Sequence, residues 1–271
     1  MINYVKKLQL ILALLAIMGL AAGCSRMDSA DGEEQPPEAA PTATPDNQTA
    51  EESAEPEDGE EDAEPIACEL DLPGDPDWPV LLCETFEDNR NEWQVESQDN
   101  PYARYTAEIS DGQFQVDYTG KIFADVSRSA LTWFDAGEAG DFALSVSGLI
   151  DTRLISTSWG VAFRANEEMD SFFLFSIYND GTYALDIFEN NGWIPLIGRR
   201  PHNSIQLGQA NEVAILAEGG DFSFRINGQE VNRFEGGLLE GGIIRLVVTA
   251  GEGASALFAF DDVVLQTAPD S

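Results

Sequence analysis

The feature that most constrains the fold is a succession of short alternating segments that begins after Cys83. Runs rich in Phe, Val, Ile and Tyr alternate apolar with polar side chains, and tight-turn dipeptides separate them. No stretch sustains helical periodicity for ten residues. Strands of this kind bury one face each, so the pattern predicts an all-β chain folded as two packed antiparallel sheets.

The turn signals are Asp111-Gly112, Asn179–Gly181, Asn190–Gly192, Gly219-Gly220 and Asn227-Gly228. Asn-Gly and Asp-Gly favour the two-residue turns whose twist suits a β-hairpin. Fourteen strands are predicted, at residues 104–110, 112–118, 129–134, 142–149, 159–165, 171–178, 182–188, 192–198, 211–217, 221–226, 229–234, 243–248, 254–260 and 261–266.

The N-terminus has the features of an export signal. Lys6 and Lys7 precede an apolar run over residues 8–23, which is too short for a confident membrane span and ends directly at Cys24. Ala21-Ala22-Gly23-Cys24 resembles the lipobox of bacterial lipoproteins. The resemblance implies that residues 1–23 are removed and that Cys24 is lipidated, so that the chain is anchored to the bacterial cell membrane, at the cell surface or the periplasmic face. An uncleaved anchor, or a plain secretory signal with an incidental cysteine, remains the alternative.

Residues 24–66 follow as an acidic, Pro- and Glu-rich segment. From Ser25 to Ile66 there are 15 acidic residues and one basic residue, Arg26. Such a composition cannot bury enough apolar surface to offset chain entropy, so it predicts a disordered stalk. Binding of cations or of a basic protein is the sharper alternative.

Residues 67–271 form the predicted domain, with 34 acidic and 11 basic side chains. This balance argues against nucleic acid and against anionic lipid, because either partner requires a basic patch. Cys68 and Cys83 are an even pair in an exported chain, and a disulfide between them closes a short Pro-rich loop. A metal or redox pair lacks the close spacing and the histidines that such sites use.

The order of the segments from about 83 to 267 resembles that of concanavalin A-like lectin/glucanase domains. The residues that carry the resemblance are ETFEDNRNEW, ISDGQFQVDY, WGVAFRA, SFFLFSIYNDGTYALDIFENNGWIPL, NEVAILAEGGDFSFRINGQEV and FAFDDVVL. Within that superfamily, the segments resemble those of laminin-G-like and 3-keto-disaccharide hydrolase-type domains. The resemblance implies a jelly-roll sandwich with one concave face, which the superfamily uses mostly to hold glycans.

The stretch TYALDIFEN can be compared with the catalytic motif of glucanases. Retaining glucanases of this superfamily carry Glu-x-Asp-x-(x)-Glu on one strand, which aims two carboxylates into one cleft. This chain offers Ala184, Asp186 and Glu189, and alanine cannot act as a nucleophile. Asp186 and Glu189 are otherwise solvent-side residues of a hairpin. With His202 as its single histidine the chain has no site built on two histidines, and no catalytic residue is assigned.

Alternation suggests where a ligand could bind. Phe173, Phe175 and Ile177 are predicted to bury, which turns Tyr178 to the opposite face. The same reasoning places Arg164 and Asp186 on that face, beside Trp159 or Trp193. These five residues are the candidate ligand-binding patch, since aromatic rings stack on sugars and planar polar side chains bridge hydroxyls. They could equally be ordinary sandwich residues, with the tryptophans in the core or under loops.

Glu87, Asp88 and Asp262 are candidate oxygen ligands for a structural calcium ion. No other cofactor is expected.

Taken together, the sequence predicts a membrane-anchored lipoprotein that displays a non-catalytic β-sandwich binding module for carbohydrate. A divergent glycoside-acting hydrolase of the 3-keto-disaccharide type is the first alternative. A protein–protein interaction scaffold of the cell envelope is the second.

Overall fold

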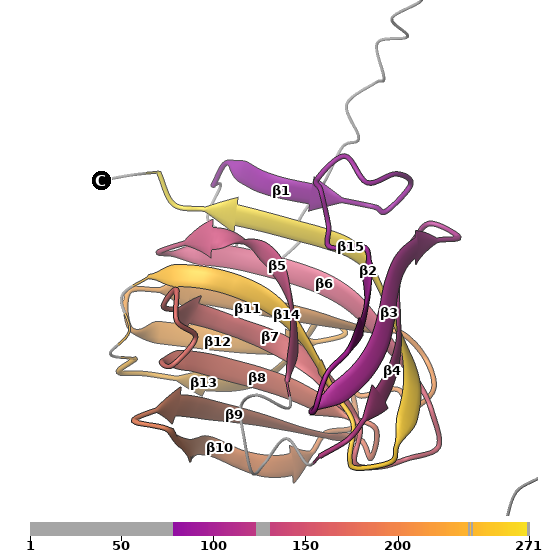
Figure 1. The fold of residues 1–271 in the computed structure, drawn as a ribbon. Helices are drawn as coiled ribbons and strands as arrows, with labels where there is room; N and C mark the ends of the chain where they lie inside the picture. Colours follow the sequence, from indigo (N-terminus) through magenta and orange to yellow (C-terminus); the bar gives the residue numbers. More distant parts are fainter. Residues whose placement is uncertain (1–77, 123–130, 238, 240, 270–271) are drawn as a thin grey trace, which may run out of the picture. The chain divides into compact units, whose positions relative to one another are not determined.

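The computed structural model describes residues 78–122, 131–237, 239 and 241–269. These residues form fifteen β-strands and no helix, which confirms the predicted all-β class (Figure 1). No helix in the described ranges is long and apolar enough to cross a membrane. The strands are β1 (Val80–Glu84), β2 (Glu96–Asp99), β3 (Ala103–Ser110), β4 (Gln113–Gly120), β5 (Thr132–Ala139), β6 (Phe142–Asp151), β7 (Ser158–Ala165), β8 (Phe172–Tyr178), β9 (Thr182–Glu189), β10 (Gly192–Pro201), β11 (Asn211–Glu218), β12 (Asp221–Ile226), β13 (Gln229–Phe234), β14 (Gly242–Thr249) and β15 (Ser255–Thr267).

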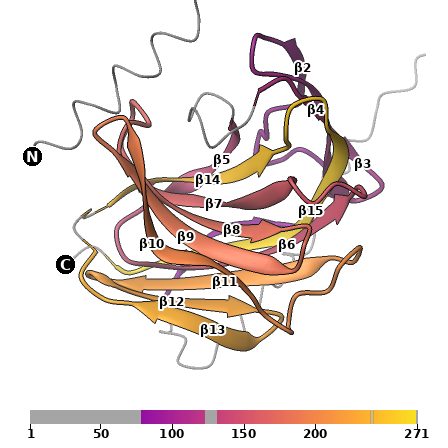
Figure 2. The same cartoon turned by 90° about the horizontal axis from the view of Figure 1, so that it is seen from below.

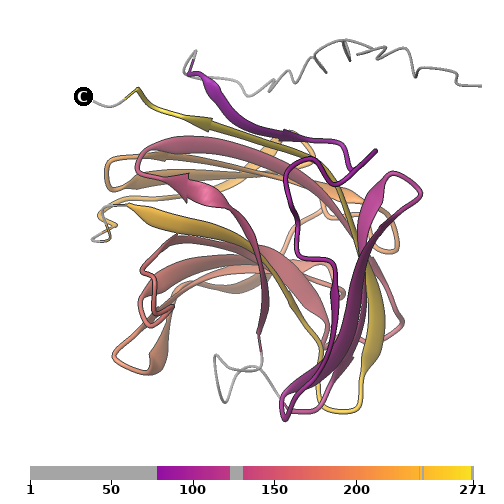
Figure 3. The same ribbon diagram turned by 45° about the horizontal axis from the view of Figure 1, so that its top comes forward.

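The strands build two antiparallel sheets that pack face to face, as a jelly-roll sandwich requires. The six-stranded sheet has the order β10-β9-β8-β7-β14-β5, and the nine-stranded sheet has the order β13-β12-β11-β6-β15-β4-β3-β2 with β1 paired to β15. Figure 2 shows β7 to β10 as one layer above β11, β12 and β13. Figure 3 shows β1 beside the end of β15, and β3 and β4 where the nine-stranded sheet curves round to the side.

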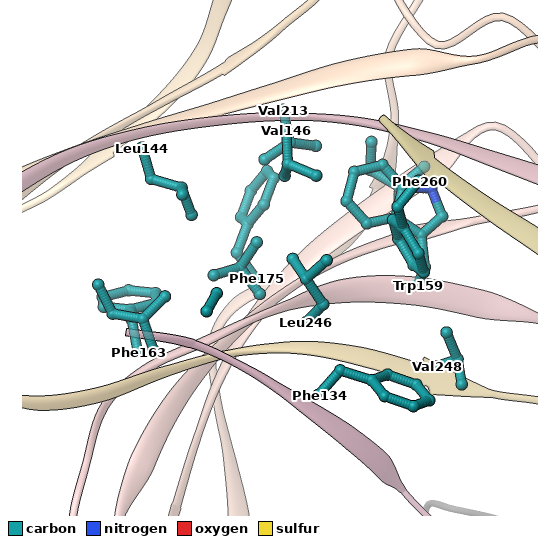
Figure 4. Close-up of a cluster of buried hydrophobic side chains, with 14 of the residues drawn as sticks. Phe134, Leu144, Val146, Trp159, Phe163, Phe175, Val213, Leu246, Val248 and Phe260 are labelled. Carbon is teal, nitrogen blue, oxygen red and sulfur yellow. The ribbon is translucent and has the colours of Figure 1, made fainter. Parts of the chain in front are cut away.

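The core lies between the sheets and is rich in aromatic side chains (Figure 4). In the six-stranded sheet, β8 contributes Phe173 and Phe175, and β7 contributes Trp159 and Phe163. Phe175 stacks on Phe224 of β12 with ring centroids 4.6 Å apart. Such contacts join the two layers, and in β8 the side chains that make them come from alternate residues, Phe173 and Phe175.

The predicted turns form the hairpins. Asp111-Gly112 joins β3 to β4 and Asn227-Gly228 joins β12 to β13, and all four residues have positive φ angles. Asn190-Asn191, with φ angles of 51° and 58°, joins β9 to β10. Asn is one of the few residues that tolerate this left-handed conformation, which explains why these dipeptides identified the strand ends.

Three strand predictions differ from the structure. β1 and β2 were not predicted, because neither VLLCE nor ESQD shows apolar–polar alternation. Residues 254–260 and 261–266, predicted as two strands, belong to the single strand β15. A bulge at Asp261–Asp262 shifts the register with β6, and Asp262 has a φ of 50°, so the acidic pair bends the strand without ending it.

The signal peptide, Cys24, the acidic stalk and Cys68 lie outside the described residues, so these assignments stay predictions. Cys83 lies in β1.

Gly148 of β6 gives a test of the core. A Cβ at this position would lie 2.6 Å from Cε2 and Cζ2 of the Trp159 indole. Gly148→Ala should therefore lower the free energy of unfolding by about 1–3 kcal/mol, measured by urea denaturation. Gly140→Ala is the control, because no atom lies within 4 Å of its added Cβ. Equal unfolding midpoints for the two variants would contradict this packing.

Candidate functional site

A pocket of about 390 Å³ lies on the face of the six-stranded sheet that is turned away from the nine-stranded sheet. We call this surface the outer face. Gly160, Ser176 and Ala184 are paired neighbours across β7, β8 and β9, so three small residues lie side by side there. Larger side chains, such as those of Tyr178 and Trp193, surround these small residues, so the sheet surface is hollowed at its small-residue positions. Gly160 is also required by the sheet, since a Cβ there would collide with the backbone of Phe175.

One end of the pocket is formed by Tyr178 and Arg199. The guanidinium carbon of Arg199 lies 3.8 Å from the centroid of the Tyr178 ring. Arg199 Nη2 donates to Asp180 at 2.7 Å, and Arg199 Nε donates to the Thr182 hydroxyl at 2.7 Å. Burial raises the pKa of Tyr178, and the nearby Asp186 charge acts in the same direction. The tyrosine is therefore a neutral hydrogen-bonding group, held by a cation that already has its partners.

Asp186 of β9 lines the same pocket. Burial raises the pKa of its carboxyl from 3.8 to about 6. Among the described residues, no group donates a hydrogen bond to this carboxyl and no cation forms an ion pair with it. A carboxylate removed from water without such partners is costly, so Asp186 is available to a ligand.

Trp193 of β10 forms the opposite wall. Its ring centroid lies 5.0 Å from that of Phe188 and 5.7 Å from that of Phe172, both in edge-on contacts. These contacts hold the indole in place. Within the described part of the chain, Trp193 Nε1 and Thr249 Oγ1 are buried and lack a hydrogen-bond partner, and both residues line the pocket. Buried polar atoms are nearly always satisfied, so two such atoms at one pocket indicate a place for polar groups from outside.

The structure brings three of the five predicted ligand-binding residues together: Tyr178, Asp186 and Trp193. Trp159 also borders the pocket, but its side chain points away from it. Its indole is 1% exposed and packs into the core, 5.5 Å from Phe260 between ring centroids, so it offers no surface to a ligand.

Arg164 is not part of the group. β7 carries a bulge opposite β14 at residues 163–164, and Arg164 has a φ of 52°. The extra residue breaks the alternation that placed Arg164 beside Tyr178. Its guanidinium instead lies 5.2 Å from the Phe222 ring of the other sheet and donates to the Leu239 carbonyl at 2.6 Å.

The catalytic pattern is incomplete in the structure as in the sequence. Ala184 pairs with Ser176, on the same face as Asp186 two residues along. Glu189 is the last residue of β9 and pairs with Gly192 at the hairpin. At position 184, where the glucanase sequence pattern has a carboxylate, this chain has the methyl group of alanine.

The three candidate calcium ligands do not form a common site. Asp88 pairs with Arg90 at 2.8 Å. The backbone N–H of Asp262 donates to the carboxylate of Asp261. Nowhere in the described ranges do three or more His, Cys, Asp or Glu side chains gather closely enough to hold a metal ion, Glu87 included.

Sequence reasoning missed Arg199 and Thr249. Alternation cannot place Arg199, because β10 has two register shifts against β9, after Pro195 and after Ile197. Thr249 is the last residue of β14, and the predicted strand stopped at 248. The arginine pair 199–200 at the end of a predicted strand was the only signal.

Neither a protein-family model nor a curated protein matches the sequence. Solved structures do match. The laminarinase catalytic domain of Thermotoga maritima aligns with a TM-score of 0.53 and 11% identity, covering 72% of this chain and 100% of that one. The endo-1,3-β-glucanase (laminarinase) catalytic domain of Thermotoga petrophila gives a TM-score of 0.51 and 9% identity, covering 72% and 99%. Carbohydrate-binding module CBM66 from Bacillus subtilis gives a TM-score of 0.48 and 14% identity, covering 64% and 94%. At these identities the likeness shows the fold, a two-sheet jelly roll.

Asp186 gives a pH-dependent prediction. An acid whose pKa is raised in the folded state destabilises that state as pH rises from the unfolded value through the folded one, here from about 4 to about 6. Asp186→Asn should therefore raise the free energy of unfolding at pH 7.5 by about 1–2 kcal/mol, after allowing for partial exposure, with little change at pH 4. Tyr178, Arg199 and Asp180 face the same region. The pKa of Tyr178 is raised above its ordinary 10.0 and that of Asp180 is lowered below its ordinary 3.8, so neither of these two acids titrates between pH 4 and 7.5.

Urea unfolding of the wild type and the variant at the two pH values measures this difference. Glu212→Gln, on an exposed position of β11, is the control for the loss of one charge. A variant that is less stable than the wild type at pH 7.5 would contradict the account of Asp186 as an unpaired, desolvated acid.

Proposed function

We propose that the β-sandwich is a glycan-binding module and that its ligand binds in the outer-face pocket. The observation that carries the proposal is Trp193, whose ring is held by Phe188 and Phe172 while its Nε1 is buried and unpartnered within the described residues. An indole fixed in this way offers an apolar ring and one hydrogen-bond donor, which suits a sugar with its C–H faces and hydroxyl oxygens.

The rest of the pocket supports the same ligand class. Its volume of about 390 Å³ lies in the range of small-molecule sites, and it combines apolar walls with a few convergent polar groups. Asp186 can accept hydrogen bonds from hydroxyls, and Thr249 can accept or donate one. Two of the solved structures that share the fold with a TM-score above 0.5 are described as laminarinase catalytic domains, which act on a glucan.

Binding without cleavage is the form of the proposal that the residues favour. Ala184 stands where the glucanase pattern places a nucleophile, and an alanine cannot attack an anomeric carbon. Asp186 alone can hold a hydroxyl but lacks the second carboxylate of a retaining mechanism.

We also propose that the module is exported and held at the bacterial membrane through lipidated Cys24, with residues 24–66 as a spacer. The sequence around Cys24 supports this location, because Ala21-Ala22-Gly23-Cys24 resembles a lipobox. A lipobox cysteine receives two or more acyl chains, which is the number that stable anchoring needs. A Cys68–Cys83 disulfide would tie the start of the domain to β1 in that oxidising compartment.

Glycan binding can be tested with the full chain, purified in a detergent without a sugar headgroup and applied to a glycan array. The wild type should bind at least one glycan class, and Trp193→Ala should weaken that binding about tenfold or more, because the ring that stacks on the sugar is removed. Trp78→Ala is the matched control: this tryptophan is partly buried against Ala143 and Ala214, a cluster separate from the pocket.

Silence of the folded wild type across the array would reject the proposal. Equal losses in the two tryptophan variants would show that stability, and not the pocket, determines the signal.

Lipidation has its own test. Cells of a bacterial host grown with a labelled palmitate analogue should yield a labelled protein in the detergent phase, because the thioether of Cys24 carries the acyl chains. Cys24→Ala should be unlabelled, whereas Cys83→Ala should keep the label. A label retained by Cys24→Ala would contradict the anchor.

A further inference from the structure

The two charged side chains of the outer-face pocket differ in whether they have hydrogen-bond or ion-pair partners. Asp186 and Arg199 are the two charged side chains that line it in the described part of the chain. Arg199 is already engaged with Asp180 and Thr182, and its guanidinium covers the Tyr178 ring. Asp186 has none of these partners. The described residues therefore supply the pocket with one uncompensated negative charge.

The cost of this charge suggests what would relieve it. A neutral hydroxyl offers a carboxylate a hydrogen bond in which only the acceptor is charged, whereas an ammonium offers a hydrogen bond together with the attraction between two opposite full charges. In a partly desolvated pocket the difference is larger than in water, because the local dielectric is lower. A carboxylated ligand would be repelled instead. The charge of Asp186 thus discriminates among sugars of similar shape.

The rest of the pocket argues against a simple amine as the ligand. A volume of about 390 Å³ is several times that of a lone ammonium group, which leaves space for a ring. Trp193 Nε1 and Thr249 Oγ1 are buried without partners in the described ranges, so the ligand should also carry oxygen atoms that satisfy them. A basic group and a polyhydroxylated body are required together.

We propose that the pocket selects an amino sugar, a sugar ring with a free, protonated primary amine that pairs with the Asp186 carboxylate. This inference rests on the proposed glycan binding and specifies its ligand class. Trp193 packs against the ring, its N–H and the Thr249 hydroxyl take ring oxygens or hydroxyls, and Asp186 takes the ammonium.

The experiment compares two ligands that differ in the amine alone. Isothermal titration calorimetry at pH 7.0 with the full chain, in detergent without a sugar headgroup, measures binding of the glucosamine disaccharide and of its N-acetylated counterpart. At this pH a sugar amine is largely protonated and Asp186 is largely ionised. The wild type should bind the free amine about tenfold more tightly than the acetylated sugar, with one site per chain.

Asp186→Asn tests whether the preference comes from this carboxylate. The variant keeps the shape of the side chain but loses its charge, so the two disaccharides should bind with similar affinity, within about twofold. Binding of the acetylated sugar should change little. Glu212→Gln removes one charge from an exposed position on the other sheet and should keep the full preference.

Salt separates the pocket from the general acidity of the chain, which carries a net charge of −35. Titrations at 0.15 M and 0.5 M NaCl should retain the preference, since a contact ion pair in a pocket is screened less than attraction over a distance. A preference that vanishes at 0.5 M NaCl, or that Glu212→Gln reduces as much as Asp186→Asn does, would overturn the inference.

Its failure is distinguishable from failure of the proposed function. If the wild type binds both disaccharides or other glycans equally and Trp193→Ala loses that binding, glycan recognition stands and the amine preference is wrong. If methylamine binds as tightly as the amino sugar, or if no sugar binds to the folded chain, both are wrong.

Discussion

The rest of the structure depends on the packing of aromatic side chains between the two sheets. Phe163, Phe173 and Phe175 face the nine-stranded sheet, where Phe222 and Phe224 meet them with ring centroids 4.6–5.2 Å apart in the closest pairs. These contacts leave no freedom of register, because a shift of one residue would move every core side chain of a strand to the other face. The register of the core side chains therefore also determines which residues of the same strands face the outer-face pocket.

β8 and β9 show how the core residues determine the outward-facing ones. Phe173, Phe175 and Ile177 pack in the core between the sheets, so the alternate residues Leu174, Ser176 and Tyr178 face outward. Asp186 faces outward because its neighbours Leu185 and Ile187 pack in that core. The position of a polar, functional side chain is therefore fixed by its apolar neighbours. The packing that stabilises the core is thus also what orients the residues of the candidate site.

The same reasoning shows how much could be predicted. Alternation and turn dipeptides were sufficient for the sandwich, for the hairpins and for the outward placement of Tyr178 and Asp186. They failed where a strand departs from strict alternation: the bulge that turns Arg164 toward Phe222, and the two register shifts of β10 that bring Arg199 onto Tyr178. A bulge depends on how two strands fit together, and that fit is not encoded in either strand alone.

Two of the five buried side-chain polar atoms that lack a hydrogen-bond partner in the described residues, Trp193 Nε1 and Thr249 Oγ1, belong to the candidate site. Arg164, although buried, has an ion-pair partner in Asp141, a carbonyl and an aromatic ring. Asp186, Trp193 Nε1 and Thr249 Oγ1 have no such partners among the described residues. Local violations of this kind are typical of functional or strained sites, and they support the proposal that a ligand binds at this pocket.

Position 184 connects the fold to the character of the site. Residues two apart on a strand lie about 7 Å from one another on the same face, so a carboxylate at 184 would share the pocket with Asp186. Two acids on the same face at such a separation would interact, so that each raises the pKa of the other, and paired carboxylates divide the roles of acid and nucleophile in glycoside hydrolysis. Ala184 leaves Asp186 as the one carboxylate among the described residues that line the pocket. A single charge cannot divide the roles of acid and nucleophile, but it can hold one cationic or hydroxyl group in place. On this face, the carboxylate pair of a retaining mechanism would therefore require an acidic residue at position 184, where this chain has alanine.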